Sequence, residues 1–178
     1  MYEWRLSTKY AKAFFNCYGA HLQQADFWKT KQAAVAIIKN KSALELFNLY
    51  SGAEQQKMIK IILNHFELPV VFSKLLLLLQ RHKKILLLPH VLSEVAELFL
   101  HKNNQLFFQI SSYPALSSLQ QDQAVAYLQR ATGMKILYES CEDQALISGL
   151  KMQSNQLLYE DTINCRLQKI HRKLVRQN

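Results

Sequence analysis

Along the first hundred residues, apolar positions recur with the period of an α-helix. Tyr10, Ala13, Phe14 and Cys17 follow the i, i+3, i+4, i+7 spacing of one helix face, and Ser7 is the expected N-cap of that helix. The same period predicts five more helices. The second helix covers 26–38, the third begins at Ser42, and the fourth begins at Ser51 and has Met58, Ile62 and Phe66 on one side. The fifth covers 70–80 with Pro69 in its first turn, and the sixth covers 85–102 with Pro89 in its first turn. This part of the chain is expected to form a six-helix bundle.

Two of these helix starts rest on a specific pattern. Ser42 with Glu45, and Ser51 with Glu54, have capping-box spacing, in which each side chain satisfies the other residue's free backbone amide. The helix over 70–80 is apolar almost all round, which is typical of a buried helix. The helix over 85–102 has a narrower inner face, made by Leu88, Leu92, Val95 and Phe99.

The pattern changes after Lys102. We first expect a strand over 105–111 that Pro114 ends, and then a helix over 118–131 with Leu119, Val125 and Leu128 inward and Gly133 as its cap. A second strand follows over 134–140. The chain then forms a hairpin of 147–152 with 157–159 around Ser154 and Asn155, and it continues into a basic helix over 163–175. We therefore predict a mainly α protein, with a six-helix bundle over 1–103 and a small α+β domain over 104–178.

Composition narrows the class of protein. Glycine (4) and proline (3) are scarce, which favours long helices. The formal charge of +9 favours an anionic partner, although scattered charges of this kind are also typical of solvated helix ends. The cysteines, Cys17, Cys141 and Cys165, form no CxxC pair and indicate reduced thiols in the cytoplasm. We find no signal-peptide core and no apolar run near the roughly 20 residues of a membrane span.

The residues offer little for catalysis or cofactor binding. The glycines, Gly19, Gly52, Gly133 and Gly149, form neither a P-loop nor a GxGxxG motif, so no nucleotide cofactor is expected. His90 and Glu94, with His101 nearby, are interpreted as a surface hydrogen-bonded pair rather than a metal site, because no further ligand has the required spacing. Cys165 and His171 are six positions apart on one predicted helix and project in different directions, so they are not a catalytic pair.

The apolar excess of two helices has two interpretations. The first helix is rich in small and aromatic residues, and the helix over 70–80 is unusually apolar. Both features fit core packing, and both fit a groove that accepts an amphipathic partner helix. Nucleic-acid binding is less favoured, because no RNP motif, KH loop or zinc-finger spacing is present. A basic helical RNA- or protein-binding module of the antitermination type remains the alternative.

Several segments, taken in order, resemble one family. These are Tyr10-Ala-Lys-Ala-Phe14, the leucine-rich stretch 77–86 around Arg81, the run Asp143-Gln-Ala-Leu-Ile-Ser-Gly-Leu150, and 158–167. The chain resembles the delta subunit of the F-type ATP synthase, the bacterial counterpart of the mitochondrial oligomycin-sensitivity-conferring protein. It departs from the family pattern where Ser148 replaces the first glycine of a Gly-Gly pair, and where Glu160 and Thr162 replace Asp and Ser.

The resemblance implies a non-catalytic stator subunit without cofactor, at the cytoplasmic face of the inner membrane. The bundle would hold the N-terminal helix of the alpha subunit, and the C-terminal domain would bind the end of the b stalk. Its implied partner-binding residues are Tyr10, Ala13, Phe14, Leu75, Leu76 and Leu79 in the bundle, and Asp143, Ile147 and Gly149 in the C-terminal domain. Phe14 is also compatible with the bundle core.

Overall fold

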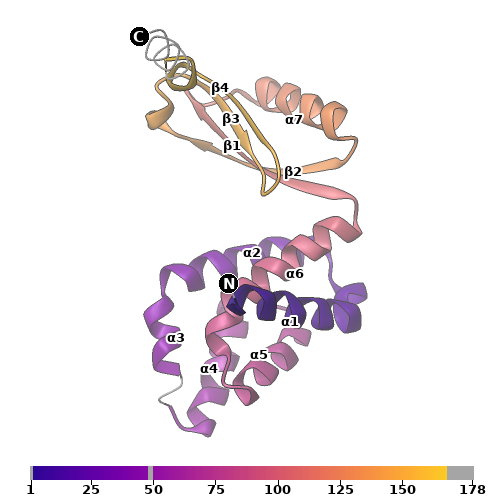
Figure 1. The fold of residues 1–178 in the computed structure, drawn as a ribbon, viewed down its shortest axis with the longest axis vertical. Helices are drawn as coiled ribbons and strands as arrows, with labels where there is room; N and C mark the ends of the chain where they lie inside the picture. The colour runs from indigo at the N-terminus through magenta and orange to yellow at the C-terminus, as the bar shows by residue number, and fades with distance from the viewer. Residues whose placement is uncertain (1, 48–49, 168–178) are drawn as a thin grey trace. The chain divides into compact units, whose positions relative to one another are not determined.

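The computed structural model describes residues 2–47 and 50–167, and the chain divides into two compact units between Lys102 and Asn103 (Figure 1). The described part is mostly helical, with a small four-stranded sheet near the C-terminus. The helices of the first unit are α1 (Tyr2–Tyr18), α2 (Gln24–Lys39), α3 (Lys41–Phe47), α4 (Gly52–His65), α5 (Val71–Arg81) and α6 (Leu88–Lys102), with short 3-10 helices at Gly19–His21 and Ile85–Leu87.

Helix α6 lies at the centre of the first unit, because both α1 and α2 pack against it. Its inner face is the predicted one: Leu88, Leu92, Val95 and Phe99 are all buried. Rings join the outer helices to this core. Phe14 of α1 lies 5.0 Å from Phe72 of α5, measured between ring centroids, so the first helix is fastened to α5 by aromatic contact.

Two predicted helix starts are wrong, and one is confirmed. Helix α1 begins at Tyr2, so Ser7 is no cap but a fully buried residue inside the helix. Ser42 likewise lies inside α3, which begins at Lys41. Serine is favoured at a helix N-cap but also occurs inside helices, so the presence of a serine alone does not locate a helix start. The capping box of Ser51 and Glu54 is present at the start of α4.

The predictions for α5 need correction at two points. The helix begins at Val71, so Pro69 precedes its first turn, and its carbonyl accepts a hydrogen bond from the Phe72 amide. The helix is also not buried all round, because Leu77 and Leu78 are 45% and 39% exposed. A helix at the edge of a small unit has only one side to bury, so the apolar residues on its other side stay in solvent.

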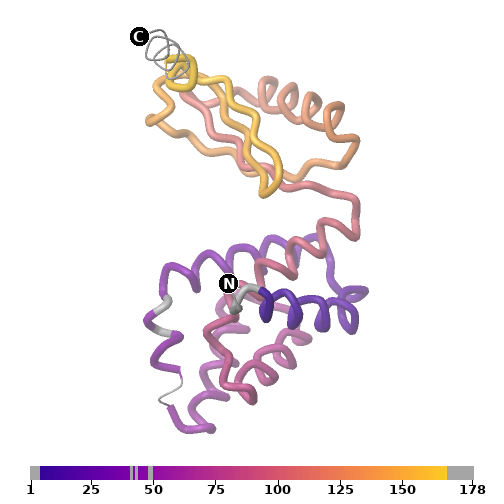
Figure 2. The backbone as a smooth tube through the Cα atoms, in the orientation of Figure 1, coloured from indigo at the N-terminus to yellow at the C-terminus, as the bar shows by residue number. Residues whose placement is uncertain are grey.

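The second unit contains β1 (Gln105–Tyr113), α7 (Ser118–Thr132), β2 (Lys135–Glu142), a 3-10 turn at Gln144–Leu146, β3 (Gly149–Gln153) and β4 (Leu158–Thr162). The strand order is β2-β1-β3-β4, with β1 parallel to β2 and antiparallel to β3. The backbone trace follows the predicted β3–β4 hairpin around a turn closed by the Ser154 amide, which donates to the Leu157 carbonyl at 2.8 Å (Figure 2).

One face of the sheet packs against α7. Phe108 and Ile110 of β1 and Leu128 of α7 are fully buried there. Gly133 ends α7 at φ 68°, as predicted. Leu119, predicted to face inward, is 67% exposed because it lies in the first turn, on the solvent side of the helix. Residues 163–167 begin a further helix; the remainder of the predicted helix 163–175, His171 included, lies outside the described residues.

Candidate protein-binding surfaces

Helices α1 and α5 are linked by side-chain contacts at two points. Tyr10 Oη and His82 Nδ1 share a hydrogen bond of 2.5 Å at one point. At the other, the Lys74 ammonium lies 4.9 Å from the centroid of the Tyr18 ring. The lower-numbered residue of α1 meets the higher-numbered residue of the α5 segment, so the two helices run antiparallel. The two contacts are about 12 Å apart along the helix axes, since eight residues separate them on each helix.

The surface beside these contacts is apolar at its centre. Lys74, Leu78 and Arg81 are exposed and follow helical spacing along the outer side of α5. A shallow groove of about 600 Å³ runs along this side of the helix. Its lining residues are Gln55, Lys74, Leu77, Leu78, Gln80 and Arg81. The Gln80 amide donates to Gln55 Oε1 at 2.8 Å, which ties the groove to α4.

The residues expected from sequence to bind a partner separate into two groups. Tyr10 is half-buried and Ala13 is exposed, so both are accessible on α1. Phe14 and the expected leucines of α5 are core residues with exposures between 0% and 6%: Phe14, Leu75, Leu76 and Leu79. The accessible leucines are Leu77 and Leu78, which the prediction omitted. Lys74 and Arg81 could have located them, since charged residues one turn away on either side identify the solvent face of the helix.

In the second unit, Gly149 and Ile147 have unusual backbone conformations. Gly149 has φ 120°, and a Cβ there would lie 2.3 Å from the Asp161 carbonyl oxygen, so only glycine fits. Ile147 has φ 64° and ψ −55°, and the Ser148 amide donates to the Leu146 carbonyl across it at 2.7 Å. This is a classic γ-turn, a strained conformation for a β-branched residue. Asp143 opens the same segment by accepting from the Ala145 amide at 3.0 Å.

The strained turn presents an apolar side chain to solvent. Ile147 is 56% exposed, and Ile163 and Leu167 are 44% and 54% exposed. The Ile163 amide donates to the Ser148 carbonyl at 2.9 Å, which brings the start of the last helix against the turn. Strain that the surrounding structure holds in place is more common at functional sites than elsewhere. We call Ile147, Ile163 and Leu167 the hairpin patch.

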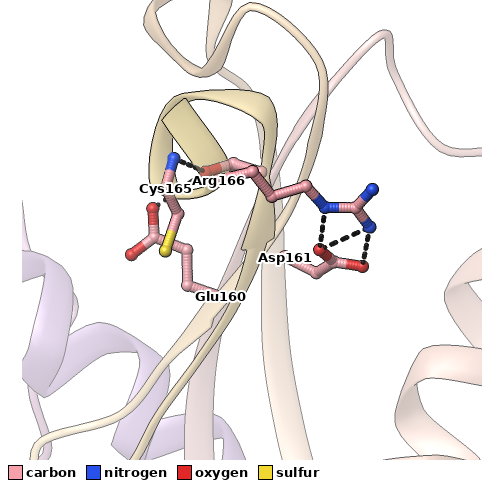
Figure 3. Close-up of polar contacts among 5 residues, drawn as sticks. Glu160, Asp161, Cys165 and Arg166 are labelled. Carbon is pink, nitrogen blue, oxygen red and sulfur yellow. Dashed lines mark hydrogen bonds and ion pairs between the residues drawn. The ribbon is translucent and has the colours of Figure 1, made fainter. Parts of the chain in front are cut away.

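Polar contacts of Thr162 and Arg166 hold the start of the helix that carries Ile163 and Leu167 (Figure 3). Thr162 Oγ1 accepts from the Cys165 amide at 3.1 Å and donates to Glu160 Oε1 at 2.9 Å, so Thr162 acts as the N-cap. Arg166 donates to both carboxylate oxygens of Asp161 at 2.8 and 3.0 Å. Glu160 and Thr162 therefore provide the same chemical groups as the Asp and Ser of the pattern that this segment resembles. Glu160 supplies the carboxylate that accepts a hydrogen bond, and Thr162 supplies the capping hydroxyl.

The titratable groups of the first unit with shifted pKa values have structural causes. The Ser51 amide and hydroxyl both donate to Glu54, which lowers the pKa of that carboxyl from its ordinary value of 4.5. Burial raises the pKa of Glu97 on α6. Glu97 belongs to the row on α6 that holds His90, Glu94 and His101, yet no group of three or more His, Cys, Asp or Glu within 2–47 and 50–167 could hold a metal ion.

Among the cysteines, Cys17 and Cys141 are exposed free thiols, and Cys165 is a half-buried one. The prediction that Cys165 and His171 do not form a catalytic pair stays a prediction, because His171 lies outside the described residues. None of the helices in the described residues is long and apolar enough to cross a membrane.

An exposed apolar stripe on α5, made by Leu77 and Leu78, and a second apolar patch on a strained turn are features of a protein that binds other proteins. The chain belongs to the ATP synthase delta (OSCP) subunit family, whose model matches residues 6–174. As a member of this family, it is a non-catalytic stator subunit of ATP synthase.

Individual relatives agree with this family. The chain is 23% identical to an ATP synthase subunit delta of Clostridium botulinum (strain 657 / Type Ba4), over 99% of both chains. It is also 23% identical to the ATP synthase subunit delta of Roseobacter denitrificans, over 76% of this chain and 73% of that protein. Its fold is similar to a chain of the Toxoplasma gondii mitochondrial ATP synthase hexamer, with a TM-score of 0.64, 20% identity and coverage of 96% and 97% of the two chains.

Proposed function

We propose that this stator subunit joins two other subunits through its two units. Helices α1 to α6 act as one six-helix bundle, residues 1–103, that binds the N-terminal helix of an alpha subunit. Residues 104–178 form the domain that binds the C-terminal end of the b stalk. The complex then sits at the cytoplasmic face of the inner membrane, and this subunit reaches the membrane only through its partners. The observation that carries this proposal is the exposed apolar stripe of Leu77 and Leu78 on α5, the helix that α1 contacts through Phe14 and Phe72.

The stripe suits a helix rather than a flat protein surface. Leu78 and Ala13 are exposed on neighbouring helices, with Tyr10 half-buried between them and the core. A small residue such as Ala13 lets a partner helix approach the α1 backbone closely. Beneath it, Phe14, Leu75, Leu76 and Leu79 fill the core and hold α1 and α5 at a fixed separation. In this proposal these buried residues shape the groove, and the exposed ones touch the partner.

The hairpin patch is the proposed contact for the b stalk. Ile147 projects from its γ-turn into solvent, and Ile163 and Leu167 add exposed apolar area on the adjoining helix. Asp143 and Gly149 support this contact without touching the partner, because Asp143 caps the turn and Gly149 permits the close approach of β4. A few apolar anchors of this kind carry most of the energy of a protein interface.

A tryptophan substitution at Ala13 tests the alpha-subunit contact. The full chain is titrated with a fluorescent peptide of about 20 residues from the start of the alpha subunit, long enough to form a helix. Ala13→Trp should block docking sterically and raise the Kd more than about tenfold, a loss of about 1.4 kcal/mol or more. Ala131→Trp, at an exposed site on α7, is the matched control and should bind as the wild type does. Unchanged affinity in a folded Ala13→Trp variant would show that the peptide binds elsewhere.

A further inference from the structure

The groove beside α5 lies between α4 and α5, because its lining residues come from these two helices. Leu77 and Leu78 make the apolar part of the lining. A pair of glutamine side chains joins the two walls, since the Gln80 amide nitrogen on α5 donates to Gln55 Oε1 on α4 at 2.8 Å. The groove is therefore an apolar surface that contains one hydrogen-bonded amide pair.

The backbone fixes the direction of this amide pair. The Gln55 amide nitrogen donates to the Phe47 carbonyl at 3.1 Å and to the Tyr50 carbonyl at 3.0 Å. A carbonyl can only accept, so both N–H groups of Gln55 are used, and its oxygen must be the atom that faces Gln80. That oxygen in turn requires the nitrogen of the Gln80 amide. The other polar atom of this amide, Gln80 Oε1, therefore lies on the side away from Gln55 and presents an acceptor of fixed direction.

Charges around the groove restrict what can meet this acceptor. Lys74 and Arg81 are exposed and line the groove, and the only carboxylic residue in the sequences of α4 and α5 is Glu54, which belongs to the capping box. A cationic side chain is repelled there. A carboxylate is attracted by the two cations, but it offers no hydrogen to Gln80 Oε1. A neutral carboxamide meets both conditions, because it brings no charge and has both a donor and an acceptor.

We infer that the partner helix carries a carboxamide, Asn or Gln, within its apolar stripe, and that this group hydrogen-bonds to Gln80. The partner's amide would donate to Gln80 Oε1 and accept from the second N–H of Gln80, while apolar residues on either side of it pack on Leu77 and Leu78. The inference rests on the proposed function and adds the residue that sets the register of the bound helix. One polar residue in an apolar stripe fixes the register of coiled coils in this way, because every other register leaves a buried polar group unpaired.

The test uses the full chain and three designed helices of about 20 residues that share one leucine stripe. One central position of the stripe is Asn, Asp or Leu, and the rest of the sequence is the same. The Kd of each labelled helix is measured by fluorescence anisotropy at about 0.5 M salt, where the attraction of exposed cations for Asp is screened. The Asn helix should bind about fivefold or more tightly than the Asp helix, because only the carboxamide can donate to Gln80 Oε1.

Three variants test the role of the amide pair. Gln80→Leu removes the amide, so the preference for Asn over Asp should disappear, and the affinity for the Leu helix relative to the Asn helix should rise about fivefold or more. Gln55→Leu leaves Gln80 present but without its fixed direction, and it should lose most of the preference. Gln56→Leu is the control, because it makes the same change at an exposed position of α4 that is not among the lining residues, and it should keep the preference. Circular dichroism and thermal melting check that each variant is folded.

The outcomes distinguish this inference from the proposed function. If the ratio of Asn to Asp affinity is the same in the wild type and in Gln80→Leu, the inference is overturned, and binding that is still lost in Ala13→Trp leaves the docking of the helix standing. A preference for Asn that depends on Gln80 but survives Ala13→Trp would support the carboxamide and remove α1 from the contact. An Asp helix that binds the wild type as tightly as the Asn helix would overturn the inference, because the cations rather than Gln80 would then select the partner.

Discussion

Gly149 at the start of β3 lies so close to Asp161 on β4 that no other residue fits in its place. A Cβ on Gly149 would come within 2.3 Å of the Asp161 carbonyl oxygen and 2.7 Å of the Thr162 Cα. Both obstacles are backbone atoms, which cannot rotate away as a side chain can. Of the glycine pair in the family pattern, the second position is therefore the one that the β3–β4 pairing needs, and Ser148 can occupy the first.

Gly149→Ala should destabilise the second unit by about 2 kcal/mol or more. A residue with a side chain is strained at this positive φ, which alone costs about 1–3 kcal/mol, and the added Cβ also collides with the backbone of β4. Urea unfolding followed by circular dichroism measures the change. Gly52→Ala is the control, because nothing lies within 4 Å of its added Cβ. It should be neutral or stabilising by about 0.5 kcal/mol, as for most glycines replaced within a helix. Equal stability of the two variants would contradict the close approach.

Thr162→Val should weaken the start of the last helix. The side chain is 1% exposed, so valine keeps the shape but removes the hydroxyl that accepts from the Cys165 amide. The expected loss of stability is about 1 kcal/mol, the usual contribution of an N-cap. Thr162→Ser introduces the residue of the family pattern and keeps the hydroxyl, so its loss of stability should be less than half of the loss caused by Thr162→Val. If valine and serine have the same effect in thermal melting, the hydroxyl is not the cap.

Ile147→Gly should have opposite effects on stability and binding. Glycine adopts the γ-turn without strain, so the second unit should become more stable by up to about 1 kcal/mol, after the entropy of glycine in the unfolded chain is subtracted. The same change removes an exposed apolar anchor, so binding to the C-terminal end of the b stalk should weaken. Pull-down with the b subunit measures binding, and Leu119→Ala, which removes an exposed leucine on α7, is the control. Unchanged b binding would remove Ile147 from the interface.

The capping box of α4 predicts a pH dependence for the first unit. Hydrogen bonds from Ser51 lower the pKa of Glu54, so the ionised carboxylate stabilises the folded state. That stabilisation is present above the ordinary value of 4.5 and is lost as the pH falls through the lower pKa of the folded state. Glu54→Gln keeps the box geometry but cannot titrate. Its stability should differ from that of the wild type at neutral pH, and the difference should shrink below pH 4.5. A constant difference would contradict this.

Elements with local signals could be predicted from the sequence. The Ser51 box, the inner face of α6, the end of β1 before Pro114 and the Gly133 cap all depend on residues within a turn of each other. The phase of α5 is harder to read, because five consecutive leucines leave no polar residue among them to mark the solvent side. The only signal comes from outside the run, where Lys74 and Arg81 lie one turn from Leu77 and Leu78 and mark these two leucines as the exposed ones.

The candidate sites illustrate the same limit. Ala13 and Tyr10 were predicted as partner-binding residues from local pattern and resemblance, and the structure leaves both accessible. The γ-turn at Ile147 has no sequence signal, because isoleucine is not a residue typical of positive φ, and the contact beside the turn joins the Ser148 carbonyl to the amide of Ile163, which is far along the chain. The Thr162 cap could have been found. A hydroxyl residue three positions before Cys165, at the start of a predicted helix, is an N-cap signal.

The order of the sheet has a consequence while the protein is being made. Strand β1 lies in the interior of the sheet, yet both of its partners come later in the chain, and Gln109 pairs with Gln153. At about 5–20 residues per second, a ribosome needs several seconds to supply that partner. Until β2 follows at residues 135–142, both edges of β1 are open to other chains, and the edge that pairs with β3 stays open until residues 149–153 follow. The speed of translation through residues 114–153 therefore sets how long a chaperone must protect the nascent strand.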